Sequence, residues 1–193
     1  MGQAGGVEGT AMHLTAEQLD AGLEHIRRSP GDRGTLQLIV RRPEAGAREE
    51  LEEGQLDPAV GLVGDTWKAR GSRHTEDGSA EVQRQLTLMN ARAAALIAVD
   101  PERRALAGDQ LYVDLDIGGA NLPTGTRLQI GDAVVEVSPL PHTGCAKFID
   151  RFGQAAGRWV NTGPGRELNL RGINAVVVQA GTVRVGDPIS KLP

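Results

Sequence analysis

The sequence predicts a mainly β protein with a few short helices, its strands rolled into a barrel. Short period-two segments follow one another closely from Gly34 onward and are separated by Gly-containing turns. Strands of this length and spacing are typical of barrels and rolled sheets, not of a Rossmann fold. Only 3% of the residues are aromatic, so the interior must be filled by aliphatic side chains, which suits sheet packing. A length of 193 residues fits one domain.

The N-terminal region predicts a tail followed by one helix. Residues 1–12 are rich in Gly and have no periodicity, so we expect a flexible tail. Residues 13–30 predict a peripheral helix, because Thr15 can act as N-cap with Gln18 three residues later and Pro30 follows. Its apolar residues recur with helical spacing at Leu19, Leu23 and Ile26.

The middle of the chain alternates between strand signals and polar loops. The alternation of Leu36, Leu38 and Val40 predicts a strand. We expect an irregular acidic surface loop over residues 44–58. Residues 61–78 form a second polar, Gly-containing segment, and a loop of that length inside a domain is often functional. Asp65 in this segment is expected to order it by bonding to nearby backbone.

One further helix is predicted among the remaining strands. Residues 85–89 predict a strand, and Asn90 is a good N-cap for a short Ala-rich helix over 91–99. The strand signals beyond Gly108 lie around Leu111 and Val113, at 128–130 and 133–137 on either side of a Gly-Asp turn, and at 175–178 and 183–185 on either side of an Ala-Gly turn.

Charge and composition exclude several classes of function. The formal net charge of -4 offers no long-range attraction to phosphate backbones, so we expect no nucleic-acid partner. No stretch approaches the roughly 20 apolar residues of a membrane span, and the N-terminus has no signal-peptide pattern. We therefore expect a cytoplasmic protein without membrane contact. With one cysteine, the chain forms no intramolecular disulfide and no Cys-cluster metal site.

Cys145 is the residue on which the chemistry is expected to depend. Pro139 and Pro141 end a strand before it, and Thr143 can cap a helical turn that places Cys145 near a helix N-terminus. The helix dipole stabilises a thiolate there, as do cations, for which the neighbouring residues offer Lys147, Arg151 and a protonated His142. A thiolate is both a nucleophile and a soft metal ligand. The alternative is a binding or adaptor domain in which Cys145 is buried and inert, since free cysteines are often core residues.

Five segments in this order resemble the MOSC domain, a family named for the C-terminus of molybdenum cofactor sulfurases. They are Gly34 to Pro43, Gly61 to Asp65, Leu122 to Gly131, the Cys145 segment, and Gly181 to Ile189. The resemblance covers residues 34–190 and implies a MOSC-like β-barrel with an essential cysteine, here Cys145. Stand-alone members are similar to bacterial proteins that reduce N-hydroxylated compounds.

The resemblance implies two related activities for Cys145. As a molybdenum ligand it would serve a pterin-type molybdenum cofactor in a molybdenum-dependent oxidoreductase that acts on N-hydroxylated compounds. As a persulfide it would make the chain a sulfur carrier or sulfur transferase. The implied partners are a small-molecule substrate, a sulfur donor or acceptor protein, and an electron-donor protein. At the family level the resemblance also implies binding of pyridoxal phosphate.

A bound pterin phosphate requires cationic groups and N–H donors around the cysteine. The candidates for this role are Arg70, Arg73, His74, Asn90, His142, Lys147, Arg166 and Arg171. For each of them the alternative is a solvated surface position or a structural one.

Overall fold

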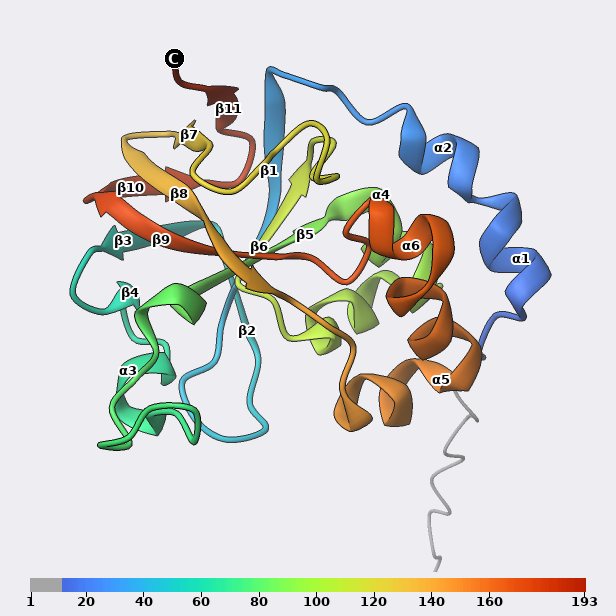
Figure 1. Ribbon diagram of the computed structural model, residues 1–193, viewed down its shortest axis with the longest axis horizontal. Coiled ribbons are helices and arrows are strands. Elements are labelled where there is room, and N and C mark those ends of the chain that lie inside the picture. The colour runs from blue at the N-terminus through green and yellow to red at the C-terminus, as the bar shows by residue number, and fades with distance from the viewer. Residues whose placement is uncertain (1–11) are drawn as a thin grey trace, which may run out of the picture.

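A computed structural model describes residues 12–193 (Figure 1). The strands are β1 (Gly34–Arg41), β2 (Glu49–Leu51), β3 (Glu53–Asp57), β4 (Gly61–Leu62), β5 (Leu86–Asn90), β6 (Leu111–Asp114), β7 (Arg127–Ile130), β8 (Ala133–Pro141), β9 (Ile173–Gln179), β10 (Gly181–Arg184) and β11 (Pro188–Lys191). The α-helices are α1 (Ala16–Ala21), α2 (Leu23–Arg27), α3 (Trp67–Arg70), α4 (Ala91–Ala98), α5 (Ala146–Asn161) and α6 (Gly163–Glu167), and the 3-10 helices are η1 (Val82–Arg84) and η2 (Pro101–Ala107).

Seven strands close into a barrel in the order β11-β7-β8-β9-β5-β6-β1, since β1 pairs with both β6 and β11. All neighbours in this ring are antiparallel except β5 and β6. That pair is parallel because α4 and η2 lie between the two strands and form the crossover that parallel pairing requires. Strand β2 extends β1 outside the ring, and β10, β3 and β4 form a separate small sheet. The predicted β-barrel is therefore confirmed.

The barrel interior is filled by aliphatic side chains, as the low aromatic content predicts. The buried cluster inside it consists of Leu, Ile, Val and Ala alone, with Leu36, Leu88 and Val135 among its fully covered members. Buried Leu and Val side chains each contribute about 1.5–3 kcal/mol relative to exposure, so this cluster supplies much of the stability of the domain.

A second core joins the barrel to the helices that gather on one side of it (Figure 1). Except for Trp67, every aromatic side chain of the chain lies in this second core, namely Tyr112, Phe148, Phe152 and Trp159. The aromatic residues therefore fix α5 against the barrel wall. None of the helices in the described part of the chain is long and apolar enough to cross a membrane.

The N-terminal helix forms where the sequence predicts it, but it is divided in two at Gly22. Thr15 accepts from the Gln18 N–H and the Gln18 side chain accepts from the Thr15 N–H, which is the expected capping box. A Cβ at Gly22 would lie 2.4 Å from Leu96 of α4, so glycine allows a close approach there. Leu19 is fully buried outside the barrel. The expected tail, apart from Met12, lies outside the described residues.

Two expectations about local structure are wrong. The first is that residues 44–58 and 61–78 are loops, whereas β2 and β3 lie within 44–58, and β4 and α3 lie within 61–78. Strand β3 pairs with β10, Leu56 opposite Gly181, and a partner so distant in sequence leaves no local signal.

The second correction concerns the segment after Cys145, which forms the long helix α5 and not a short turn. Its N-cap is Cys145 and not Thr143. The helix is interrupted at Gly153, whose φ of 86° is left-handed. Its buried face follows helical spacing through Phe148, Phe152, Ala156, Trp159 and Val160.

Candidate functional site

A cavity of about 790 Å³ opens where the end of β1, α3, the end of η2 and the start of α5 meet. Its size falls within the range of pockets that hold small molecules and cofactors. The lining comes from segments far apart in sequence: residues 42–48, 66–70, 107–108 and 142–151, together with Thr87 and Arg171. The barrel therefore assembles a site that no single segment contains.

Cys145 lines this cavity and is exposed. As N-cap of α5 it has an extended backbone, and its carbonyl oxygen accepts from the N–H groups of Phe148 and Ile149. Its thiol makes no capping hydrogen bond, so the sulfur remains available to a ligand or reagent. The alternative in which Cys145 is buried is wrong.

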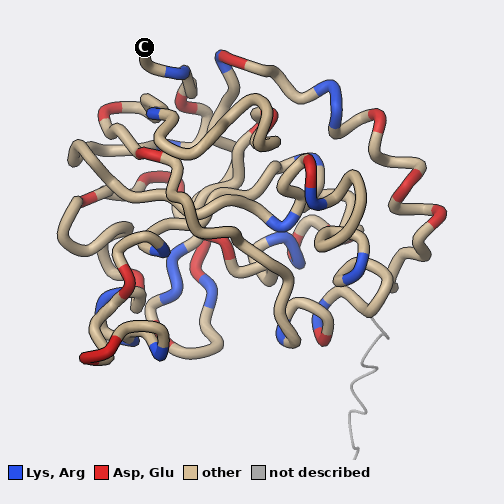
Figure 2. Tube along the Cα trace, in the orientation of Figure 1, with Lys and Arg blue, Asp and Glu red and all other residues tan. Residues whose placement is uncertain are grey.

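The cavity lining is strongly cationic. Its basic members are Arg42, Arg48, Arg70, Lys147, Arg151 and Arg171, whereas its acidic members are Glu44 and Asp150. Basic and acidic residues are otherwise distributed over the whole trace (Figure 2). Burial, followed by the charge of Arg42, lowers the pKa of Arg70, and burial followed by Arg151 and Arg42 lowers the pKa of Arg48. An arginine remains charged even so, and this crowding of like charge favours an anionic occupant.

Arg42 is held in place by Asp65. The carboxylate accepts from Arg42 Nε and Nη2, each at 2.8 Å, and from the backbone N–H groups of Arg42 and Trp67 at 3.0 and 2.9 Å. Burial alone would raise the pKa of Asp65, but these bonds and the Arg42 charge outweigh burial and lower it. The expectation that Asp65 orders its own loop is confirmed, and the same side chain also fixes a cation at the cavity.

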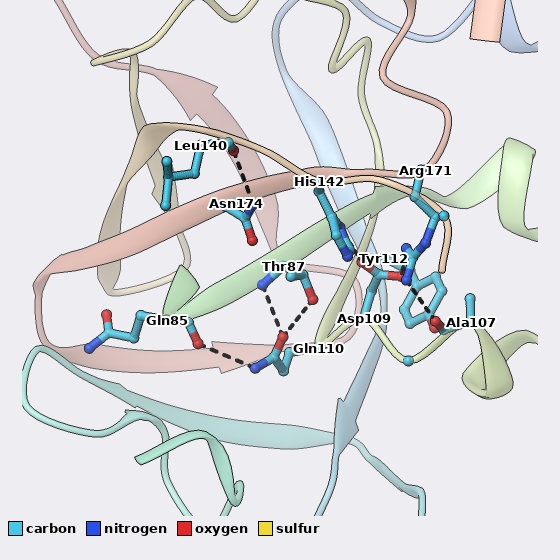
Figure 3. Close-up of polar contacts among 12 residues, drawn as sticks. Gln85, Thr87, Ala107, Asp109, Gln110, Tyr112, Leu140, His142, Arg171 and Asn174 are labelled. Atoms are coloured by element: carbon cyan, nitrogen blue, oxygen red, sulfur yellow. Dashed lines mark hydrogen bonds and ion pairs between the residues drawn. The ribbon is translucent and has the colours of Figure 1, made fainter. Parts of the chain in front are cut away.

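A buried ion pair forms the base of the cavity, and Figure 3 shows the side chains of His142 and Arg171 directed at Asp109. Arg171 Nη1 donates to Asp109 Oδ2 at 2.6 Å, and Nη2 donates to the Ala107 carbonyl at 3.0 Å. The Arg171 guanidinium also stacks 4.9 Å from the Phe148 ring centre. Burial raises the pKa of Asp109 and Arg171 opposes this rise. The Arg171 guanidinium thus favours the ionised form of Asp109, which burial disfavours.

The pKa of His142 is lowered, which disfavours the protonated imidazole expected from the sequence. Burial, then the charges of Arg171, Arg42 and Arg84, lowers the pKa of His142 well below its ordinary value. Its Nδ1 lies 3.3 Å from Asp109 Oδ1, and the side chain is 16% exposed. The imidazole thus adds no positive charge beside Cys145.

The structure brings together half of the predicted cofactor-binding residues. With Cys145, the cavity is lined by Arg70, His142, Lys147 and Arg171. The side chains of Arg73, His74 and Arg166 are exposed and do not line it. Asn90 is buried elsewhere, where it caps α4 and donates to Ser29 and to the Leu115 carbonyl.

Several residues of the cavity are absent from the predicted cofactor-binding set. Among them, Arg42, Arg48 and Arg151 line the cavity, and Asp109 lies beneath it. Arg42 directly follows a predicted strand, and Asp109 lies between a left-handed glycine, Gly108, and the buried strand β6. Arg42 and Asp109 could have been predicted from the sequence, because each is a charged residue next to a buried strand. Arg48 lies in a segment with no such signal.

Three solved structures of bacterial proteins are among those that share this fold. The YuaD protein from Bacillus subtilis is 16% identical with a TM-score of 0.57, and the match covers 82% of this chain and 95% of that one. YiiM from Escherichia coli is 18% identical with a TM-score of 0.53, covering 82% and 70%. YiiM from Geobacillus stearothermophilus is 11% identical with a TM-score of 0.58, covering 83% and 75%.

A search of curated proteins gave no match. The MOSC domain matches residues 83–190, which is more than half of the chain and includes Cys145, Asp109 and Arg171. The closed barrel, the fold shared with YuaD and YiiM, and this match agree with one another. The chain belongs to the MOSC domain family.

Proposed function

We propose that this chain binds an anionic, pterin-type molybdenum cofactor in the cavity, with the Cys145 thiolate as the protein ligand to the metal. The observation that carries the proposal is the exposed Cys145 thiol on a cavity lined by six cationic side chains. A soft thiolate suits molybdenum, and guanidinium groups suit the acidic group of the cofactor.

The donor set fits a metal that brings most of its own ligands. Among residues 12–193, no group of three or more His, Cys, Asp or Glu side chains is arranged to hold a metal ion. A metal held by protein side chains alone needs three or four such ligands. A single thiolate is therefore sufficient only if an organic chelator supplies the remaining coordination, as the dithiolene of a pterin cofactor does.

In this proposal, the residues of the chain bind and orient the cofactor. Arg42, fixed by Asp65, and Arg70 on α3 would hold the anionic group of the cofactor. Lys147 and Arg151 of α5, the helix that has Cys145 as its N-cap, would add to this positive charge. When bound, molybdenum supplies two-electron redox chemistry.

The reaction class that we propose is reduction of an N-hydroxylated compound. The N–O bond is broken, two electrons arrive from an electron-donor protein, two protons are taken up, and the products are the amine and water. The cavity volume of about 790 Å³ leaves room for a substrate beside a cofactor.

A second candidate is sulfur transfer by a Cys145 persulfide. The exposed position of Cys145 favours it, because a protein acceptor must reach the sulfur. The neighbouring cations would stabilise the persulfide anion as they would a thiolate.

Metal and sulfur analysis of the purified protein separates the two candidates. The protein is produced in a host that makes molybdenum cofactor and in one that does not, with Cys145→Ser as the matched control. The proposal expects stoichiometric molybdenum only in the wild-type protein from the competent host. Cyanide-labile sulfur on Cys145 without molybdenum would support the sulfur-carrier candidate. Protein that holds neither molybdenum nor labile sulfur would contradict both candidates.

A further inference from the structure

His142 and Asp109 form a buried contact below the Cys145 cavity. Asp109 Oδ1 and His142 Nδ1 lie 3.3 Å apart, and neither makes a well-aligned hydrogen bond to any group, the other one included. Gly172 covers the contact, since a Cβ there would lie 3.1 Å from each of these two atoms and 2.6 Å from the Leu88 carbonyl oxygen. A side chain at position 172 would therefore crowd this contact.

This contact decides which nitrogen of the neutral imidazole carries the proton. If Nδ1 were unprotonated, its lone pair would lie beside a buried carboxylate oxygen, which is repulsive and places two buried acceptors next to each other. With the proton on Nδ1, the same two atoms form a donor and an acceptor. Asp109 is held in place by Arg171, so the carboxylate fixes both the tautomer and the ring orientation.

The other ring nitrogen then becomes an acceptor for a ligand. Nε2, unlike Nδ1, is not among the buried unpaired atoms, and His142 lines the cavity. The cationic side chains around it offer N–H donors only. Glu44 and Asp150 are exposed at the rim, and the Thr87 hydroxyl donates to Gln110. His142 thus adds a neutral acceptor to a cavity that otherwise attracts anions.

We propose that His142 is a ligand-contacting specificity residue: Nδ1, which lies beside Asp109 Oδ1, carries the proton, and Nε2 accepts a hydrogen bond from a ring N–H of the bound pterin. Asp109 is the positioning residue of this arrangement. The choice of a pterin rests on the proposed function, whereas the tautomer rests on the contact with Asp109 and on the neutral form of His142. An occupant that combines an acidic group with a ring N–H satisfies both the arginines and His142.

The tautomer is tested without any ligand by ¹⁵N NMR of histidine-labelled wild-type protein. The His142 signals are assigned by their absence from the His142→Gln spectrum, which removes one of four histidines. At neutral pH we expect a protonated Nδ1 and an unprotonated Nε2. The opposite tautomer, or a doubly protonated ring, overturns the proposal.

Ligand contact is tested with 6-carboxypterin, a fluorescent pterin that carries a carboxylate and ring N–H groups. We expect His142→Leu to weaken its binding about tenfold, the effect of losing one buried hydrogen bond. His142→Gln should restore binding, because its amide offers one donor and one acceptor as neutral imidazole does. Circular dichroism and thermal melting of both variants check that they fold.

The outcomes separate this inference from the proposed function. Equal binding by the wild type and His142→Leu overturns the role of His142 and leaves pterin binding intact. No binding by the wild type contradicts both. His142 also borders a second hollow of about 410 Å³ lined by Leu140 and Ile173. The probe must therefore also protect Cys145 from alkylation, and binding without protection overturns the proposal.

Discussion

Asp65 accepts two hydrogen bonds from the Arg42 guanidinium, both at 2.8 Å, and its side chain is completely buried. The pair connects the end of β1 to the loop that leads into α3, and Arg42 Nη1 also donates to the Gly108 carbonyl at 3.1 Å. Three walls of the cavity are therefore joined through one guanidinium. The pair determines both where a cation stands and how the loop is held.

Replacing Asp65 by Asn should destabilise the protein by about 3 kcal/mol, because it leaves the Arg42 charge buried without a partner. Urea unfolding measures the change. The matched control is Glu49→Gln, which breaks the more exposed pair with Arg41 and should cost less than about 1 kcal/mol. Equal losses in the two variants would contradict the special position of the Arg42 pair.

The same pair predicts how this difference depends on pH. The folded-state pKa of Asp65 is lowered, so its stabilising contribution is present above the pKa of an unfolded Asp and is lost as the pH falls through the folded value. The stability gap between the wild type and Asp65→Asn should therefore shrink below about pH 4. Asp109, whose pKa is raised, is present in both proteins, so its pH-dependent contribution to stability cancels from the difference. A gap that stays constant down to the acid transition would speak against the ion pair.

Anion binding should depend on Arg70 and not on Arg73. Both lie on the same loop region, but Arg70 lines the cavity whereas Arg73 is exposed outside it. Arg70→Gln should weaken 6-carboxypterin binding about tenfold, as expected for loss of a charge-assisted hydrogen bond, and Arg73→Gln should leave it unchanged. Fluorescence titration at two salt concentrations measures this, with weaker wild-type binding at higher salt. Equal effects of the two substitutions would mean that only net charge matters.

The N-terminal helices should contribute measurably to stability although they lie outside the barrel. Leu19 is fully buried in the second core, and Asp20 Oδ1 accepts from Trp159 Nε1 at 2.9 Å. Leu19→Ala should cost about 3 kcal/mol, the usual loss for a buried leucine. Thr15→Ala should cost about 1 kcal/mol through the lost cap. A Leu19→Ala variant with wild-type urea stability would show that α1 is not docked in solution.

Deletion of residues 1–12 should have no such effect. Those residues are Gly-rich and offer little to bury, and the deletion retains His13, whose Nε2 lies 3.1 Å from the Arg151 carbonyl oxygen. The melting temperature should stay within a few degrees of the full chain. A larger fall would mean that the tail is docked.

The sequence predicts the elements whose signals are local. The capping box at Thr15 and the Asn90 cap are contained in a few neighbouring residues, and both form as expected. Strand β3 depends on pairing with β10, far along the chain, so its own residues do not reveal it. In α5, Phe148, Phe152 and Trp159 recur with helical spacing. Gly153 and Gly157 lie among them and make this spacing hard to recognise in the sequence.

The site is predicted only in part for the same reason. Cys145 and Lys147 lie in one segment with strong local signals, whereas Arg42 and Asp109 reach the cavity through the closure of the barrel. The charge state of His142 depends on burial and on Arg171, Arg42 and Arg84, which no local pattern contains. Sequence spacing identifies Cys145 as the candidate residue, and tertiary structure supplies its surroundings.

The central claim is that Cys145 is a reactive thiol in the cavity that ligates the cofactor metal. Alkylation of the native protein by iodoacetamide, followed by mass spectrometry of the Cys145 peptide, tests it most directly. We expect cofactor-free protein to be alkylated at neutral pH without unfolding, and molybdenum-loaded protein to be protected. Cys145→Ser should fold normally and hold no molybdenum, because a hydroxyl supplies no soft anionic ligand at neutral pH. If Cys145 reacts only after unfolding, or equally fast in loaded and cofactor-free protein, the claim is wrong.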